Sequence, residues 1–340
     1  MRRFFPFTWI TWLMLMAWAT DQVRGDEEVF NTVRVKGRNY VNLSDLARYY
    51  EFDRNWTQDG LNVTLRSKLK WKKLGIKINS RDCMVNGVRI WLNDAPLESR
   101  NSVLISEVDV RKTLDPILRV WAVPKRRVRT VMIDPGHGGE DKGTDGAHNS
   151  IEKRLTLDLA LRVERLLKQA GFKILMTRRA DTYISLEDRS EQANSSDADI
   201  FVSLHFNSAK PNPQPHGIET FCLTPAGFSS TGSFQQRLGI GRFGEEAGNE
   251  SDRHNMLLAY LVQQRLLAGL PKAEDRGIKR ARFHVIKATK RPSILVEAGF
   301  LSHTAEEKRI RDPVYRNKLA AAIVDGIKKY AAVMNSPAKD

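Results

Sequence analysis

The chain has 340 residues, of which 41% are hydrophobic, and it carries a formal net charge of +15 at pH 7. This hydrophobic content excludes an intrinsically disordered chain, and the length allows two domains or one large one. The chain has only two cysteines, Cys83 and Cys222, which excludes a scaffold stapled by several disulfides. We expect both to be buried and unpaired, with a single disulfide between them as the alternative.

The first 25 residues have the pattern of a secretory signal peptide. Arg2 and Arg3 precede an apolar run of about 15 residues, and an Ala-x-Ala pattern typical of a cleavage site follows at 17–19. The run is shorter than the roughly 20 apolar residues of a membrane-spanning helix, and an uncleaved signal anchor is the alternative. We therefore expect an exported protein of the periplasm or cell envelope. There, the positive charge favours anionic wall polymers or lipid head groups as partners and argues against nucleic acid.

Residues 26–123 have the pattern of a small α+β domain. Short β-prone segments separated by turn residues lie at 29–37, 60–67, 76–80 and 83–93. Two helices are predicted over 42–52 and 106–118. The Asn86-Gly87 step between β-prone residues predicts a tight hairpin.

The segment 124–129, PKRRVR, is the predicted linker to a second domain over 130–335. Predicted strands there cover 130–134, 172–177, 198–206, 217–223, 283–287 and 293–300. Predicted helices cover 151–171, 185–196, 253–270 and 312–333, with Ser185 and Asp312 as N-caps. This alternation predicts an α/β domain with a twisted, mostly parallel sheet and helices on both faces.

Four ionisable residues lie at the ends of these predicted elements. His137 follows the strand 130–134, His205 and Glu297 end later strands, and Glu152 opens a helix. Because the carboxyl ends of parallel strands meet at one sheet edge, we expect the four side chains to lie together. Two histidines and one carboxylate with an open fourth position are the ligand set of a catalytic zinc. The remaining carboxylate could then take a proton from water.

Each of the four residues also has an ordinary structural explanation when taken alone. A histidine that ends a strand is usually a hydrogen-bonded core or rim residue, and a first-turn glutamate such as Glu152 favours the helix dipole. Glu297 is harder to explain, because burying a carboxylate without a partner is costly. Their common placement at one sheet edge favours the functional interpretation.

Seven motifs in the chain follow the order of a known family. They are IDPGHGGEDKG, EKRLTLDLALRVERLL, TRRADTYISLEDRSEQAN, ADIFVSLHFNS, GIETFCL, DRGIKRARFHVIKATKRPSILVEAGFLS and RDPVYRNKLAAAIVDGI. This order resembles the zinc-dependent N-acetylmuramoyl-L-alanine amidases of the amidase_3 family, over essentially all of residues 129–332. By this resemblance His137, Glu152 and His205 are the ligands of one Zn²⁺, and Glu297 is the catalytic carboxylate.

The resemblance implies hydrolysis of the amide between N-acetylmuramic acid and L-alanine in peptidoglycan, for wall remodelling or daughter-cell separation. One alternative is a non-catalytic envelope-binding protein, against which the intact set of four residues argues. The other is a zinc hydrolase that cuts a different bond of peptidoglycan. We also expect Asn207 to hydrogen-bond substrate and Arg276 to meet a stem-peptide carboxylate. Their alternatives are a loop-turn asparagine and a surface ion pair with Asp275.

The segment 223–252 is longer than the minimal family connection. Some cell-division amidases of the family carry a self-inhibitory insertion at about this position. The segment is therefore a predicted lid over the zinc on which a protein activator acts, and an exposed flexible loop is the alternative. The acidic residues that could compete for the open coordination position are Glu245, Glu246 and Glu250. We expect the protein to be a monomer.

The pattern YVNLSDLARYY followed by VNGVRIWLNDAPL resembles the small module at the N-terminus of copper amine oxidases. No histidine lies in residues 26–123, so no copper chemistry is inferred. We expect a targeting or regulatory role for this domain, by analogy.

Overall fold

The computed structural model describes residues 30–53, 57–68, 72–99, 102–231 and 243–337. The predicted signal peptide therefore lies outside the described residues. Within them, no helix has the length and apolar character needed to cross a membrane. The described residues from Asn31 onward belong to one compact unit.

The N-terminal part combines short antiparallel strands with helical segments. Its strands are β1 (Thr32–Val35), β2 (Arg38–Asn42), β3 (Thr57–Asp59), β4 (Asn62–Arg66), β5 (Lys73–Lys77), β6 (Asp82–Val85), β7 (Val88–Trp91), β8 (Leu97–Ser99) and β9 (Ser102–Ser106). Its helical segments are α1 (Leu43–Tyr49), α2 (Glu107–Asp109), the π-helical η1 (Val110–Leu114), α3 (Asp115–Leu118) and the 3-10 turn η2 (Val120–Ala122). The helix predicted over 42–52 is confirmed as α1, whereas 106–118 is divided among α2, η1 and α3.

The predicted hairpin is confirmed between β6 and β7. Asn86 and Gly87 have φ of +50° and +84°, and the flanking Val85 and Val88 are paired across the turn. Two successive left-handed residues are what a two-residue hairpin loop requires.

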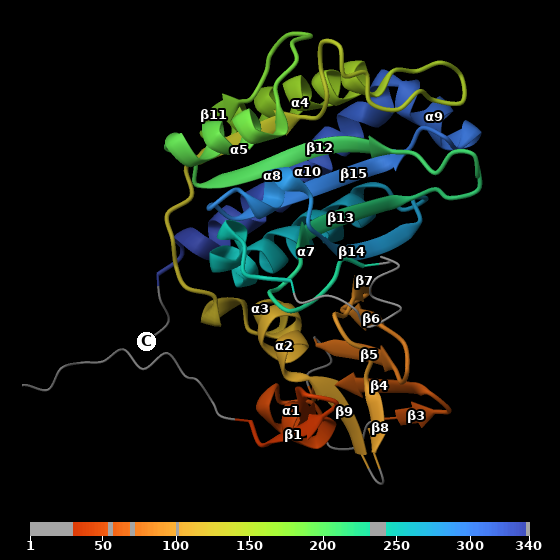
Figure 1. The fold of residues 1–340 in the computed structure, drawn as a ribbon, viewed down its shortest axis with the longest axis vertical. Helices are drawn as coiled ribbons and strands as arrows, with labels where there is room; N and C mark the ends of the chain where they lie inside the picture. The colour runs from red at the N-terminus through yellow and green to blue at the C-terminus, as the bar shows by residue number, and fades with distance from the viewer. Residues whose placement is uncertain (1–29, 54–56, 69–71, 100–101, 232–242, 338–340) are drawn as a thin grey trace, which may run out of the picture. The chain divides into compact units, whose positions relative to one another are not determined.

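The C-terminal part is an α/β arrangement, as predicted (Figure 1). Its strands are β10 (Thr130–Pro135), β11 (Lys173–Met176), β12 (Ile200–Asn207), β13 (Ile218–Leu223), β14 (Asp275–Ala281) and β15 (Ser293–Phe300). Its helices are α4 (Glu152–Gln169), α5 (Leu186–Ser195), α7 (Asp252–Gly269), α8 (His284–Lys287), α9 (Thr304–Arg311) and α10 (Pro313–Asn335), with the 3-10 turn η3 (Ala247–Ser251) before α7. Ser185 and Asp312 cap α5 and α10 through their side chains, as expected.

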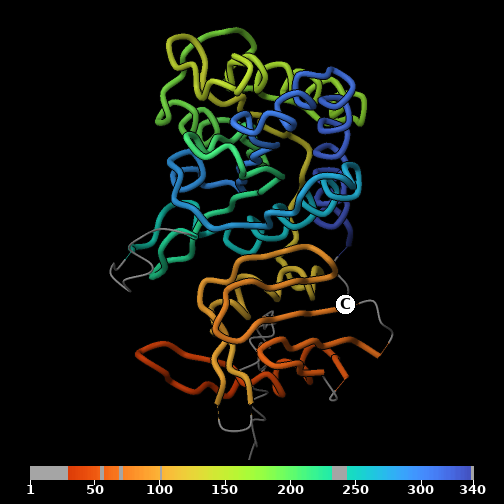
Figure 2. Tube along the Cα trace, turned by 90° about the vertical axis from the view of Figure 1, so that its right-hand side faces the viewer, coloured from red at the N-terminus to blue at the C-terminus, as the bar shows by residue number. Residues whose placement is uncertain are grey.

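The strand order in this part is β11-β10-β12-β15-β13-β14. All neighbouring pairs are parallel except β13 and β15, so the sheet is mostly parallel, as predicted. Strands β12 and β15, far apart in the chain, lie side by side (Figures 1 and 2). Their register places His205 directly beside Glu297.

The same sheet continues into the N-terminal part. Strand β14 pairs with β7, and the order runs on through β6, β5, β4 and β3. The Asp275 carboxylate accepts a hydrogen bond from the Arg89 backbone N–H at 2.7 Å. The fully buried Arg280 guanidinium donates to the Lys112 carbonyl and the Thr113 hydroxyl. These bonds attach β7 and η1 of the N-terminal part to β14.

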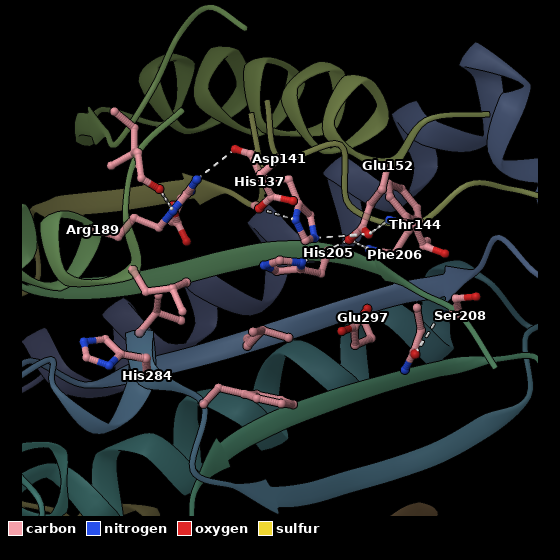
Figure 3. Close-up of a pocket in the computed structure, with 18 of the residues that line it drawn as sticks. His137, Asp141, Thr144, Glu152, Arg189, His205, Phe206, Ser208, His284 and Glu297 are labelled. Carbon is pink, nitrogen blue, oxygen red and sulfur yellow. Dashed lines mark hydrogen bonds and ion pairs between the residues drawn. The ribbon is translucent and has the colours of Figure 1, made fainter. Parts of the chain in front are cut away.

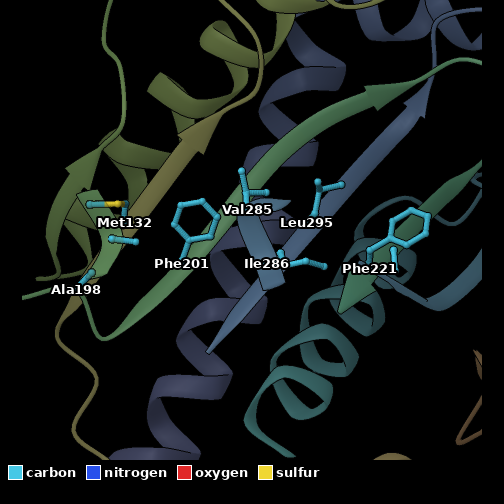
Figure 4. Packing of buried hydrophobic residues seen from close by; sticks show 9 residues of the cluster. Met132, Ala198, Phe201, Phe221, Val285, Ile286 and Leu295 are labelled. Carbon is cyan, nitrogen blue, oxygen red and sulfur yellow. The ribbon is translucent and has the colours of Figure 1, made fainter. Parts of the chain in front are cut away.

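Apolar side chains fill both faces of the sheet. Figure 4 shows one face, where Phe201 and Leu295 pack against Val285 and Ile286 of α8. On the strands, these two alternate with Val202 and Ile294, which are equally buried and point to the opposite face. Strands buried on both faces require helices on both, so α5 and α8 are matched by α4, α7 and α10.

The structure corrects one predicted strand and adds another. The segment 283–287 is not a strand, because residues 284–287 form the short helix α8. A short apolar run does not distinguish a strand from a buried helical turn. Residues 275–281, which read as polar, form β14 instead. Cys83 and Cys222 are both free and buried, as expected.

Helices α7 and α10 pack so closely at Gly326 that a Cβ there would lie 2.6 Å from the Val262 Cα. Alanine would gain about 1 kcal/mol of helix propensity, but overpacking against a backbone costs about 1–3 kcal/mol. We predict that Gly326→Ala lowers the free energy of unfolding in urea by about 1 kcal/mol. Gly244→Ala is the control, since a Cβ there meets nothing within 4 Å. Equal stability of the two variants would contradict the prediction.

Candidate active site

The structure brings His137, Glu152 and His205 together. The Nε2 of His137 lies 3.1 Å from one Glu152 carboxylate oxygen, and the Nδ1 of His205 lies 3.0 Å from the other. One potential ligand atom from each residue lies within 4.8 Å of those of the other two. Figure 3 shows the three side chains converging on one point. Their donor atoms are those that bind a divalent transition metal.

The loop after β10 brings the two imidazoles close. His137 has a φ of +60°, a left-handed conformation that few residues other than glycine adopt. At the preceding Gly136, a Cβ would lie 2.2 Å from the Cε1 of His205. Only glycine at this position lets the backbone pass the His205 ring.

Glu152 is buried at the first position of α4 and is held through both carboxylate oxygens. Oε1 accepts a hydrogen bond from the backbone N–H of Phe206, and Oε2 accepts one from that of Thr144. Burial alone would raise the pKa of Glu152, but the hydrogen bonds and charges of His137 and His205 lower it well below its usual range. Glu152 is therefore held as a carboxylate.

Asp141 orients the first histidine. Its carboxylate lies 2.8 Å from His137 Nδ1 and also accepts the backbone N–H of Gly143. Burial would lower the pKa of His137, but hydrogen bonds and charges from Glu152 and Asp141 raise it. With Nδ1 engaged, His137 presents Nε2 to the cluster. The sequence analysis did not identify Asp141, although its place four residues after His137 was a visible signal.

A buried carboxylate anchors the base of this loop. Asp134 is fully buried and accepts hydrogen bonds from Thr177 at 2.6 Å, Ser203 at 2.7 Å and Arg189 at 2.5 Å. The Arg189 guanidinium also donates to the carbonyl of His137 at 2.8 Å. The backbone of the histidine is therefore tied to a satisfied buried ion pair. No local sequence pattern identifies these partners, because they come from separate elements.

Glu297 lies beside the cluster in a different electrostatic environment. Its Oε2 is inaccessible to solvent and has no hydrogen-bond partner within the described part of the chain. Burial and the negative charges of Glu152 and Glu219 raise the pKa of Glu297 well above its usual range, with Lys279 acting in the opposite direction. The protonated form is thus stabilised in the absence of a cation.

Asn207 and Arg276 both donate hydrogen bonds to the carboxylate of Glu219, a residue that the sequence analysis did not identify. Glu219 is buried and accepts hydrogen bonds from the Asn207 amide and the Arg276 guanidinium, each at 2.8 Å. Lys279 also pairs with it. Asn207 lines the cavity described below, whereas Arg276 is not among its lining residues and lies over the Phe300 ring. The Arg276 ion pair is thus with Glu219, not Asp275.

The cluster opens into a cavity of about 320 Å³. It is lined by Asp134, Gly136, His137, Asp141, Thr144, Glu152, Tyr183, Ile184, Leu186, Arg189, His205, Phe206, Asn207, Ser208, Phe283, His284, Val285, Leu295 and Glu297. All four predicted ligand and catalytic residues therefore face one space.

The predicted lid is described only in part, because residues 232–242 lie outside the described residues. Its three glutamates are not among the residues that line the cavity. Glu246 caps the turn η3 and lies 3.6 Å from the Arg282 guanidinium. Glu245 and Glu250 are exposed.

Comparisons with known proteins agree with these motifs. The family model Amidase_3, described as N-acetylmuramoyl-L-alanine amidase, matches residues 131–329. The chain is 36% identical over 201 residues to the N-acetylmuramoyl-L-alanine amidase LytC of Bacillus subtilis, a match covering 59% of this chain and 35% of LytC. It is 34% identical over 220 residues to the amidase AmiA of Salmonella typhimurium, covering 59% of this chain and 76% of AmiA. The chain thus spans about a third of LytC and three quarters of AmiA.

A solved structure has the same fold over this region. The N-acetylmuramoyl-L-alanine amidase AmiC2 of Nostoc punctiforme superposes with a TM-score of 0.50 and 32% sequence identity. The superposition covers 60% of this chain and 97% of the AmiC2 chain.

We predict that Arg189→Met lowers the free energy of unfolding by about 3–5 kcal/mol, because it leaves the Asp134 carboxylate buried without its charged partner. Urea unfolding with a chelator present measures this effect independently of any bound metal. Arg179→Met is the matched control: its side chain is 51% exposed and pairs with Glu164, so a loss under about 1 kcal/mol is expected. Similar losses in both variants would show that Asp134 does not depend on Arg189.

Proposed function

Because the chain belongs to the N-acetylmuramoyl-L-alanine amidase family, we propose that it hydrolyses the amide between N-acetylmuramic acid and L-alanine in peptidoglycan. We propose that His137, Glu152 and His205 hold one zinc ion and that Glu297 is the catalytic carboxylate. The observation that carries this proposal is the convergence of three ligand atoms within 4.8 Å, beside a carboxyl group without a partner, in one open cavity.

The shape and chemistry of the cluster fit a bound zinc ion. Two imidazole nitrogens and a carboxylate are the protein ligands of many hydrolytic zinc sites, which keep a further position open. The ligands are also packed tightly from outside: a Cβ at Gly143 would lie 2.6 Å from Glu152 Oε2 and 2.7 Å from His137 Cδ2. When bound, zinc supplies Lewis-acid chemistry, since it polarises a carbonyl and lowers the pKa of water.

In this proposal, Glu297 moves the proton during the reaction. Its carboxylate accepts a proton from the attacking water and delivers it to the leaving nitrogen of L-alanine. A general base works best when its pKa is near the operating pH, and burial raises the pKa of Glu297 in that direction. The raised pKa thus suits Glu297 to take up a proton and then return it.

Asp141 contributes by positioning. The hydrogen bond between its carboxylate and His137 Nδ1 selects the tautomer whose Nε2 is free for a metal. Gly143, which donates its backbone N–H to Asp141, keeps that carboxylate in place.

The predicted signal peptide supports action outside the cytoplasmic membrane, where peptidoglycan lies. We also propose that the segment 223–252 regulates access to the site in response to a protein activator. Its position just before α7 and its length support this proposal.

Digestion of purified peptidoglycan tests the function. We predict that the full chain releases stem peptides with free L-alanine amino groups, that a chelator stops the release, and that added zinc restores it. Glu297→Gln should lower the rate by at least about 10²-fold while zinc binding persists, because the proton acceptor is lost. Glu98→Gln, an exposed residue of β8, is the control.

The outcomes separate the alternatives. Binding of peptidoglycan without release would favour the non-catalytic envelope protein. New peptide-bond ends within the stem would favour a zinc hydrolase of another bond. A fully active Glu297→Gln variant would contradict the catalytic role of this residue.

The raised pKa of Glu297 predicts a pH-dependent stability of the metal-free chain. The folded state binds this proton more tightly than the unfolded state, so unfolding free energy falls as pH rises from about 4.3 through the folded pKa. Glu297→Gln removes this loss. Its stability relative to wild type should therefore increase between pH 5 and pH 8, measured by urea unfolding with a chelator. A difference that does not vary with pH would contradict the prediction.

A further inference from the structure

One side of the cavity presents exposed apolar side chains. Tyr183, Leu186 and Phe283 line the cavity and are 50%, 53% and 41% exposed. Nine large hydrophobic side chains are exposed among the described residues, and these three line the same cavity. Exposed apolar groups gathered at a pocket indicate a binding surface.

The fold builds this surface from two helix starts, which we call the α5–α8 wall: Tyr183 and Leu186 at α5, and Phe283 and Val285 at α8. Helices α5 and α8 pack against each other. The Phe283 ring contacts Phe221 edge-on, with ring centroids 5.1 Å apart, which holds it in place. The wall is therefore held in place by the packing of α5 on α8 and of Phe283 on Phe221.

The wall lies on one side of the cluster formed by His137, Glu152 and His205. Figure 3 shows Arg189 of α5 and His284 of α8 on one side of the two histidines, and Thr144 and Ser208 on the other. The second side carries the hydroxyl groups of Thr144 and Ser208 next to Phe206, and Asn207, which precedes Ser208 in the chain, also lines the cavity. The cavity thus has an apolar end and a polar end, with the cluster between them.

Two polar side chains along the wall, Arg189 and His284, already have partners. The Arg189 guanidinium is buried and bonded to Asp134 and backbone carbonyls. His284 has its Nδ1 3.7 Å from a Glu187 carboxylate oxygen. An anionic ligand would therefore find little to pair with at this end, whereas an uncharged ring with C–H faces would fit it.

The two halves of the proposed substrate differ in this respect. On one side of the scissile amide is the pyranose ring of muramic acid, which is uncharged and presents C–H groups. On the other side is a peptide with amides and carboxylates. Resting on the proposed function, we propose that the α5–α8 wall binds the sugar ring through Tyr183 and Phe283, while the polar end receives the stem peptide.

Two substrates with the same scissile amide test this assignment. One is N-acetylmuramoyl-L-alanyl-D-isoglutamine, and the other is D-lactyl-L-alanyl-D-isoglutamine, which lacks the sugar. The preference is the ratio of their kcat/KM values. A lost aromatic contact is worth roughly 2- to 10-fold, so Tyr183→Ala and Phe283→Ala should each lower the preference by roughly that factor.

The controls separate binding from folding. Leu161→Ala removes an exposed apolar side chain of α4 outside the cavity and should leave the preference unchanged. Phe283→Leu keeps an apolar side chain against Phe221 but loses the ring face, so it should also lower the preference. Tyr183→Ala lies on a separate segment and decides the question if Phe283→Ala does not fold.

Three results are decisive. A selective loss on the sugar-bearing substrate supports the assignment. Equal losses on both substrates, or none, would overturn it while the amidase activity stands. A wild-type chain inactive on both these substrates and on whole peptidoglycan would instead refute the proposed function.

Discussion

The site depends on the buried contact between Asp134 and Arg189. A fully buried carboxylate is stable only when its oxygens are satisfied, and Asp134 takes hydrogen bonds from β12, α5 and the end of β11. Arg189 then continues to the carbonyl of His137. The same ion pair that joins these elements therefore also holds the backbone carbonyl of the first proposed ligand, whose φ is left-handed.

Glu297, a carboxyl group at the same sheet edge, differs from Asp134 in its hydrogen bonding. Asp134 is surrounded by donors, whereas one oxygen of Glu297 is buried without a partner within the described residues. Two carboxyl groups with such different environments are suited to different work. Asp134 holds geometry, and Glu297 is left with a proton affinity that a structural carboxylate would not have. Glu152, held by two histidines and two backbone N–H groups, is the third case: a carboxylate fixed in its charged form.

The sequence was most informative where chain direction alone determines position. Because parallel strands end at one edge, the prediction that His137, His205 and Glu297 lie together follows from strand order, and the structure places them around one cavity. The features that the sequence could not predict depend on tertiary contacts. Strand β14 carries Arg276 and Lys279, which pair with Glu219 of the neighbouring strand β13, so its sequence does not resemble that of a buried strand. The short helix α8 was wrongly predicted as a strand, because four residues are too few to show the hydrophobic periodicity of a helix.

Strand β14 joins the site to the N-terminal part of the chain. On one side it carries Arg276 and Lys279, which neutralise Glu219 next to Glu297. On the other side it pairs with β7 and receives hydrogen bonds from Arg89 and Trp91. Without those two cations, Glu219 would be a second uncompensated carboxylate beside Glu297, and both could not stay charged at low cost. The strand that joins the N-terminal strands to the α/β sheet is thus also the one whose cations balance the charge of Glu219 beside the proposed catalytic carboxyl group.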